Sequence, residues 1–199
     1  MTYRNAIEDY IRQAALPADK FSHQPRLYAL ACSLAQAQSY DDDTLHAAAW
    51  LHDLGVFIGH RPVDPVALAA WDNVKYAVEQ VPALLEKMDF PRHKIPYVVQ
   101  AVSEHLPSKN PGSIEGILLR DADILEQLGA TGILRTVSKT GRDTRFIRHQ
   151  DALRALHKSL DELPTKLQLE SSRHIAQQRV ALMRAFLQAA ELEGLGLDW

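Results

Sequence analysis

A histidine–aspartate pair is the first feature of this sequence whose side chains could do chemistry together. His52 and Asp53 lie in LHDLG at 51–55, where a predicted helix ends near Gly55. An imidazole nitrogen and a carboxylate on adjacent residues can face one point if that helix end borders a cavity, and both groups are ligands for divalent metals. Such a pair is also common at solvated helix ends, so it predicts a metal site only together with further ligands.

A second histidine supplies one of these ligands. His23 precedes His52 by 29 residues and forms the pattern His-x-x-Arg with Arg26. It opens the helix predicted over 22–38, which a short link joins to the helix predicted over 42–54. Helices joined in this way run antiparallel, so the start of the first should lie beside the end of the second. We therefore expect three ligands to converge, with a packed or helix-capping His23 as the alternative.

The elements that must position these residues are helical. Apolar residues follow a helical period along almost the whole chain, and no strand pair, internal repeat or low-complexity tract is evident. We expect an all-α fold, a compact helical bundle with additional C-terminal helices. The helices are predicted over 2–15, 22–38, 42–54, 66–88 with a break or kink near Pro82, 97–106, 114–128, 130–140, 149–160 and 165–192.

Composition bounds the class of protein. The 199 residues, 46 % of them hydrophobic, suffice for a single domain over 1–199. A net charge of -3 gives no basic excess for a nucleic-acid polymer. The one cysteine, Cys32, excludes an internal disulfide and a cysteine-rich zinc site. No segment has the ~18 consecutive apolar residues of a membrane span, and the N-terminus does not have the pattern of a secretory signal. We expect a cytoplasmic protein without a membrane partner.

The segment RDADILEQLG at 120–129 supports a family resemblance. His23, His52-Asp53 and the Asp123 of Ala-Asp-Ile-Leu together resemble the His…His-Asp…Asp signature of the HD superfamily of metal-dependent phosphohydrolases. LRDADILEQLGATGILR and the later SSRHIAQQRVALMRAFLQAAELE are similar to small bacterial HD proteins that include nucleoside triphosphate pyrophosphohydrolases. The resemblance implies an HD helical bundle with its metal-binding core over about 20–130. The helices over about 149–192 would pack on that core or form a small subdomain.

Two aspartates compete for the fourth ligand position. The Ala-Asp-x-Leu context favours Asp123 by resemblance. Helical arithmetic favours Asp121, which shares a face with apolar residues such as Leu118 and Leu125. We give the motif more weight and predict Asp123 as the ligand. Asp121 is then either the alternative ligand or an acid that supports the ligands.

The predicted ligand set indicates the kind of metal. Two imidazoles and two carboxylates suit one five- or six-coordinate divalent ion, Mn, Fe, Co, Ni or Mg, better than a closed tetrahedral zinc site. Coordination positions left open to water are what metal-assisted hydrolysis requires.

Other residues receive roles by resemblance. His105 lies where relatives often carry a histidine that binds or protonates phosphate, although a surface histidine at a helix end is the alternative. Arg26 and Arg135 are the candidates for binding substrate phosphate. His60 falls in a loop and is expected at the surface. Relatives tend to carry a further histidine near Trp71, and its absence argues against a second metal.

The resemblance implies a metal-dependent phosphohydrolase acting on a small phosphorylated substrate, with nucleotides as the first candidates. One alternative is an HD-fold lyase, hydratase or oxygenase. Another is a non-catalytic ligand-binding domain in which the metal is structural. All three readings share the same fold and the same metal ligands.

Overall fold

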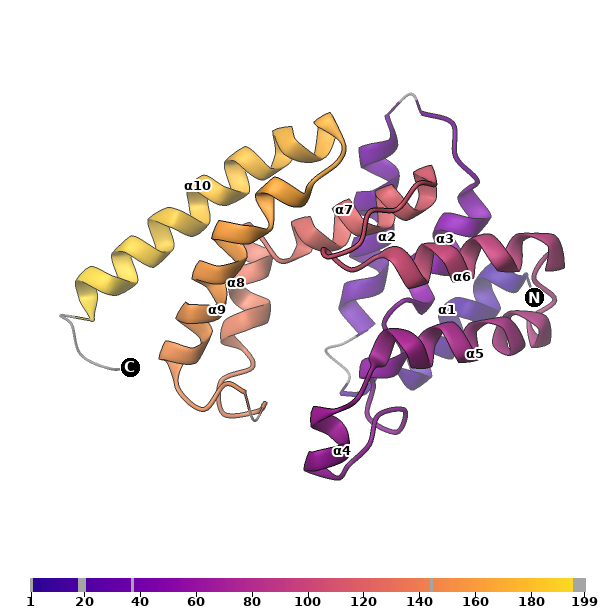
Figure 1. The fold of residues 1–199 in the computed structure, drawn as a ribbon, viewed down its shortest axis with the longest axis horizontal. Coiled ribbons are helices and arrows are strands. Elements are labelled where there is room, and N and C mark those ends of the chain that lie inside the picture. Colours follow the sequence, from indigo (N-terminus) through magenta and orange to yellow (C-terminus); the bar gives the residue numbers. More distant parts are fainter. Residues whose placement is uncertain (1, 18–20, 37, 144, 195–199) are drawn as a thin grey trace. The chain divides into compact units, whose positions relative to one another are not determined.

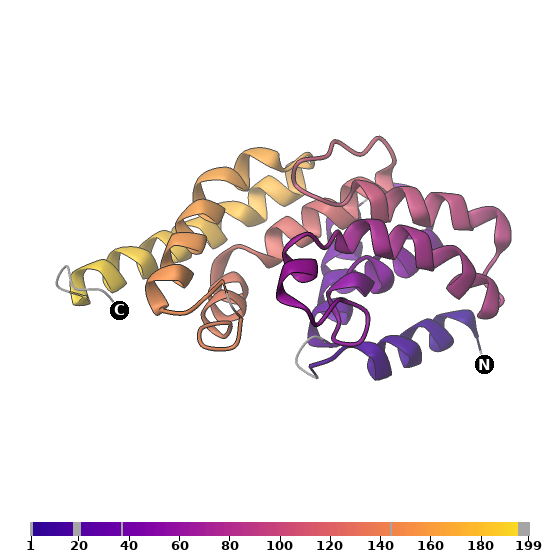
Figure 2. The same ribbon diagram turned by 60° about the horizontal axis from the view of Figure 1, so that its bottom comes forward.

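The computed structural model describes residues 2–17, 21–36, 38–143 and 145–194. These residues form ten α-helices, several 3-10 turns and no strand, apart from one isolated bridge between Ile58 and Arg61 (Figures 1 and 2). The all-α prediction is confirmed. The chain divides into two units, residues 1–120 and 121–199, and each is described by itself. Within the described residues, no helix combines the length and the apolar character needed to cross a membrane.

The first unit is built around α3 (Asp42–Leu51), in which every residue from Thr44 to Leu51 is buried. Helices α1, α2 and α6 pack against α3, and α5 packs against α6 (Figure 1). Small residues at Ala47–Ala49 allow these neighbours to approach α3 closely. The His52–Asp53 pair therefore follows directly after a central, fully packed helix. The other helices of this unit are α1 (Tyr3–Ala14), α2 (His23–Ala35), α4 (Pro65–Ala69), α5 (Asn73–Lys87), α6 (Ile95–Glu104) and the first half of α7 (Ile114–Glu126).

The second unit contains the end of α7 and three further helices, α8 (Gly129–Val137), α9 (His149–Glu162) and α10 (Glu170–Glu193). These three helices pack against one another. Arg179 joins α10 to the end of α7, because its Nη1 donates a hydrogen bond of 2.5 Å to the carbonyl of Leu125. Gly129 has a φ of +68° and lies against Arg179, where a Cβ atom would be 2.9 Å from the arginine Cβ. A glycine is therefore required at this turn.

Most bounds differ from the predicted ones by a few residues, and two differences change the backbone around the candidate site. The α-helical part of α3 ends at Leu51, and Leu54–Val56 form a 3-10 turn in place of a last α-turn. The segment predicted as one helix over 66–88 is two helices, α4 and α5. Asp64 and Asp72 begin them, since each side chain accepts a backbone N–H three residues later. Pro82 lies inside a continuous α5 and does not break it.

Candidate metal centre

The end of α3 presents His52 in a defined orientation. His52 is the C-cap of α3, its side chain is 1 % exposed, and its Nδ1 lies 2.9 Å from the carbonyl oxygen of Ala49. A carbonyl oxygen can only accept a hydrogen bond, so Nδ1 carries the proton. In a neutral ring, the lone pair that a metal needs is then on Nε2.

His23 and Asp53 lie beside this Nε2 atom. His23 is the first residue of α2 and is 5 % exposed. The Asp53 Oδ2 atom lies 3.7 Å from His52 Nε2 and 3.9 Å from His23 Nε2, and ligand atoms of the three residues lie within 4.8 Å of one another. Two donors that are each ~2.1 Å from one ion lie roughly 3–4 Å apart. Both separations from Asp53 Oδ2 are in this range, and the three side chains could hold a single divalent ion.

The burial of this cluster is uneven. Both histidines are buried, whereas the Asp53 side chain is 22 % exposed. Water can therefore reach the cluster on its carboxylate side. This is the arrangement expected of a metal centre with open coordination positions, in contrast to a closed structural site.

His105 adds a third imidazole to the cluster. It follows α6 as the C-cap, is 2 % exposed, and its ring centroid lies 5.0 Å from that of His52. Its Nδ1 donates a hydrogen bond of 2.6 Å to the carbonyl of Val102, so Nε2 is the nitrogen available for other contacts. The structure thus brings His105 next to the predicted metal ligands, buried and not at the surface.

A fourth buried histidine, His46, has a separate role. Its Nε2 lies 3.0 Å from Glu8, and its ring contacts Tyr28 and Trp50. Burial lowers the pKa of His46, and the interaction with Glu8 opposes this effect in part. His46 therefore joins α1 to α3 in the core.

Charged side chains anchor the other end of α3. Asp41, Asp42 and Asp43 stand at its N-terminus, where negative charge is favourable. Lys94 Nζ pairs with Asp41 at 2.6 Å and Asp43 at 2.8 Å, and Arg4 pairs with Asp42 at 2.8 Å and Asp43 at 2.6 Å. Partial burial alone would raise the pKa of Asp43, but the hydrogen bonds from Lys94 and Arg4 outweigh it and lower this pKa to about 2. The network holds α1 and the start of α6 to α3.

The turn that follows His52 and Asp53 is packed against α5. A Cβ atom on Gly55 would lie 2.4 Å from the carbonyl oxygen and 2.6 Å from the Cα of Asn73. In addition, Trp71 Nε1 donates a hydrogen bond of 2.8 Å to the Gly55 carbonyl, and His60 Nδ1 donates one of 2.9 Å to the Leu54 carbonyl. The sequence did not indicate either hydrogen bond, and the surface role expected for His60 does not describe it.

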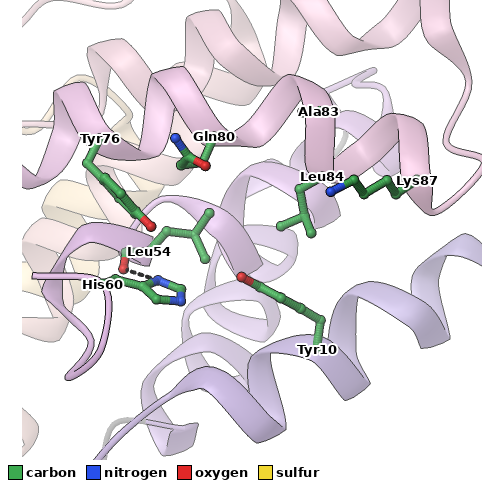
Figure 3. A pocket seen from close by; sticks show the side chains of 8 residues that line it. All are labelled: Tyr10, Leu54, His60, Tyr76, Gln80, Ala83, Leu84 and Lys87. Atoms are coloured by element: carbon green, nitrogen blue, oxygen red, sulfur yellow. Dashed lines mark hydrogen bonds between the residues drawn. The ribbon is translucent and has the colours of Figure 1, made fainter.

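A pocket of about 200 Å³ lies on one side of this turn. Figure 3 shows the His60 ring turned toward Leu54, between the rings of Tyr76 and Tyr10. The volume is below the ~300–1,000 Å³ of ordinary ligand pockets, so we assign it no ligand. The residues that line it are Tyr10, Leu54, His60, Tyr76, Gln80, Ala83, Leu84 and Lys87.

The predicted substrate-binding arginines have different surroundings. Arg26 is exposed on α2, one turn after His23. Arg135, in the second unit, is half-buried, and its Nη1 lies 3.6 Å from a carboxylate oxygen of the buried Glu126. Arg26 therefore lies on the same helix as a predicted metal ligand, whereas the charge of Arg135 is partly balanced within its own unit.

The two candidate aspartates, both in the second unit, also differ. Asp121 is fully buried, and its carboxylate accepts hydrogen bonds from the backbone N–H groups of Gln168 at 3.1 Å and Leu169 at 2.8 Å, just before α10. Asp123 is half-buried, and its carboxylate accepts a hydrogen bond of 3.3 Å from Gln127 on the same helix. The burial of Asp121 thus agrees with the apolar face on which its helical spacing places it. The choice of ligand stays a prediction.

Comparison with known proteins places this geometry in context. The model of the HD domain family matches residues 21–128. YpgQ from Bacillus subtilis is similar in fold, with a TM-score of 0.76 and 22 % identity over 98 % of this chain and 97 % of YpgQ. The structure of YpgQ in complex with ADP gives a TM-score of 0.75 and 22 % identity over 98 % and 96 % of the two chains. An HD-superfamily hydrolase from Bacillus thuringiensis gives a TM-score of 0.70 and 21 % identity, over 98 % of this chain and 100 % of the hydrolase. No curated protein sequence matches the chain.

Proposed function

The chain belongs to the HD-domain family, and from this premise we propose that it is a metal-dependent phosphohydrolase acting on a small phosphorylated compound, with nucleotides as the first class to test. The convergence of His23, His52 and Asp53, with ligand atoms within 4.8 Å of one another, carries the proposal. The solved complex of YpgQ with ADP supports a phosphorylated ligand. The fold is shared with HD-superfamily hydrolases.

The metal would be held by His23, His52 and Asp53, and an aspartate of α7 would complete the set. Asp123 is proposed from its sequence context, with Asp121 as the alternative that its complete burial favours. A divalent ion held by these residues would supply a hydroxide nucleophile near neutral pH and would neutralise charge on a phosphoryl oxygen. The mixed nitrogen and oxygen donors suit Mn, Fe, Co, Ni or Mg.

Residues of the chain supply the remaining chemistry. Protonated His105 would donate its Nε2 proton to a phosphate or leaving-group oxygen, while its Nδ1 stays bonded to Val102. The exposed guanidinium of Arg26 offers paired donors that match phosphate oxygens. We propose Arg135 as a second phosphate contact, in exchange for part of its interaction with Glu126.

The test is release of phosphate or pyrophosphate by the purified protein, loaded in turn with Mn²⁺, Co²⁺, Ni²⁺ and Mg²⁺. The substrates are nucleoside mono-, di- and triphosphates and simple phosphate esters. We expect His52→Ala and Asp53→Ala to abolish metal-stimulated turnover. Exposed His93 and Asp89 provide matched controls, and His93→Ala and Asp89→Ala should retain it.

Each negative outcome has a separate meaning. A metal-loaded protein that binds nucleotides without turnover contradicts the proposed activity and favours the non-catalytic alternative.

A separate measurement decides the fourth ligand. The metal affinities of Asp123→Asn and Asp121→Asn are compared, because loss of a ligand weakens metal binding more than loss of a neighbouring acid does.

A further inference from the structure

The carbonyl groups of Asp53, Leu54 and Gly55 all accept hydrogen bonds. Asp53 is the N-cap of the 3-10 turn Leu54–Val56, and its carbonyl accepts the N–H of Val56 at 3.0 Å. The carbonyls of Leu54 and Gly55 accept hydrogen bonds from His60 and Trp71. Carbonyls at the end of a helix have no partner within the helix, and here side chains bond to two of them in succession.

Both donors are themselves held in place. The Trp71 ring lies 5.3 Å from that of Tyr76, which in turn lies 5.6 Å from the ring of His60. His60 also packs against Phe57, with ring centroids 5.9 Å apart. Figure 3 shows Tyr76 and His60 of this series, with the bond between His60 and Leu54 marked. Because the rings pack in series, the two donors form one support for the turn.

We propose that Trp71 and His60 are positioning residues for the metal centre, an inference that rests on the proposed metal site. The direction of the Asp53 carboxylate depends on the backbone angles of Asp53, and these depend on where the next two residues are held. The support holds those residues by their carbonyls, and so keeps Asp53 Oδ2 within 4 Å of both histidine nitrogens. Neither positioning residue belongs to the cluster of His23, His52 and Asp53.

The test is the dissociation constant for Mn²⁺ alone, measured by titration calorimetry on Trp71→Phe. Phenylalanine keeps an aromatic ring against Tyr76 and removes the N–H donor together with part of the indole ring. One hydrogen bond contributes about 0.5–1.5 kcal/mol, which corresponds to about a twofold to tenfold weaker affinity for Mn²⁺. The absorption spectrum of the Co²⁺-loaded variant should change as well, because the carboxylate donor moves.

Trp50→Phe is the matched control. The structure gives the Trp50 indole N–H no acceptor among the described residues, and the ring is 4 % exposed. This variant should lower the melting temperature of the metal-free protein through lost packing and leave the Mn²⁺ affinity within twofold of the wild type. Stability and metal affinity are thereby measured separately.

His60 provides a second, independent pair of variants. The side-chain amide N–H of asparagine lies close to the position of histidine Nδ1–H, so His60→Asn keeps a donor for Leu54, whereas His60→Leu removes it. We expect weaker Mn²⁺ binding in His60→Leu and recovery of most of the affinity in His60→Asn.

Unchanged Mn²⁺ affinity in both Trp71→Phe and His60→Leu would overturn the inference, whatever their melting temperatures. A wild-type protein that binds no divalent ion overturns it together with the proposed site. A protein that binds Mn²⁺ normally and turns over no phosphate compound contradicts the proposed activity alone.

Discussion

Replacing Gly55 by alanine should disturb both the packing of the first unit and the metal centre. The added Cβ would lie 2.4, 2.6 and 2.8 Å from three backbone atoms of Asn73. Ordinary contacts begin at 3.4 Å, so the backbone must move by up to about 1 Å, and no change of rotamer can relieve the clash. We expect a loss of about 2–3 kcal/mol in the free energy of unfolding.

The assay is thermal unfolding of the metal-free protein and of the protein with Mn²⁺. For a chain of this size, about 2–3 kcal/mol corresponds to a fall of roughly 4–12 °C in melting temperature. Because Gly55 lies two residues after Asp53, the stabilisation produced by Mn²⁺ should also be smaller in the variant. The fall in melting temperature without metal reports on packing, and the smaller stabilisation by Mn²⁺ reports on the candidate metal centre.

Gly112→Ala is the control for the change of residue type. A Cβ atom on Gly112 has no other atom within 4 Å, and its φ is not positive. This variant should be as stable as the wild type, or about 0.4–1 kcal/mol more stable. Equal melting temperatures for Gly55→Ala and Gly112→Ala would refute the contact between the turn and α5.

Two further predictions concern stability. The pKa of Asp43 is lowered from 3.8 to about 2, so its contribution of about 2 kcal/mol is present above pH 3.8 and is lost as the pH falls toward 2. The difference in urea stability between the wild type and Asp43→Asn should therefore be constant near pH 6–7 and shrink below pH 5; a difference independent of pH would contradict this. Arg179→Met should lower the unfolding free energy by about 1–2 kcal/mol, because the carbonyl of Leu125 loses a charged donor. Hydrogen exchange at the end of α7 should rise in that variant, and unchanged protection there would argue against the bond.

The sequence determined the fold class and the core of the candidate site for identifiable reasons. The helical period is a local property, so the presence of most helices could be predicted without tertiary contacts. The approach of His23 to the His52–Asp53 pair could be predicted because a short link makes two helices antiparallel. The same arithmetic placed Asp121 on an apolar face, and this residue is fully buried.

The tertiary structure decided what depends on irregular backbone. The α-helical part of α3 stops at Leu51 and a 3-10 turn follows, a boundary that no residue pattern marks. The hydrogen bonds from His60 and Trp71 depend on how the connection after this turn folds back. The burial of His105 beside His52 likewise requires α6 to pack on α3.

The division has a physical cause. Residues three or four positions apart on a helix share a face, so burial and short-range pairing are encoded in spacing. Hydrogen bonds from a loop to the end of a helix join residues whose separation has no period, and they form only when distant helices are already packed. For this protein, the sequence alone therefore identified three candidate metal ligands that the structure brings together, whereas only tertiary packing showed how the turn that carries Asp53 is held.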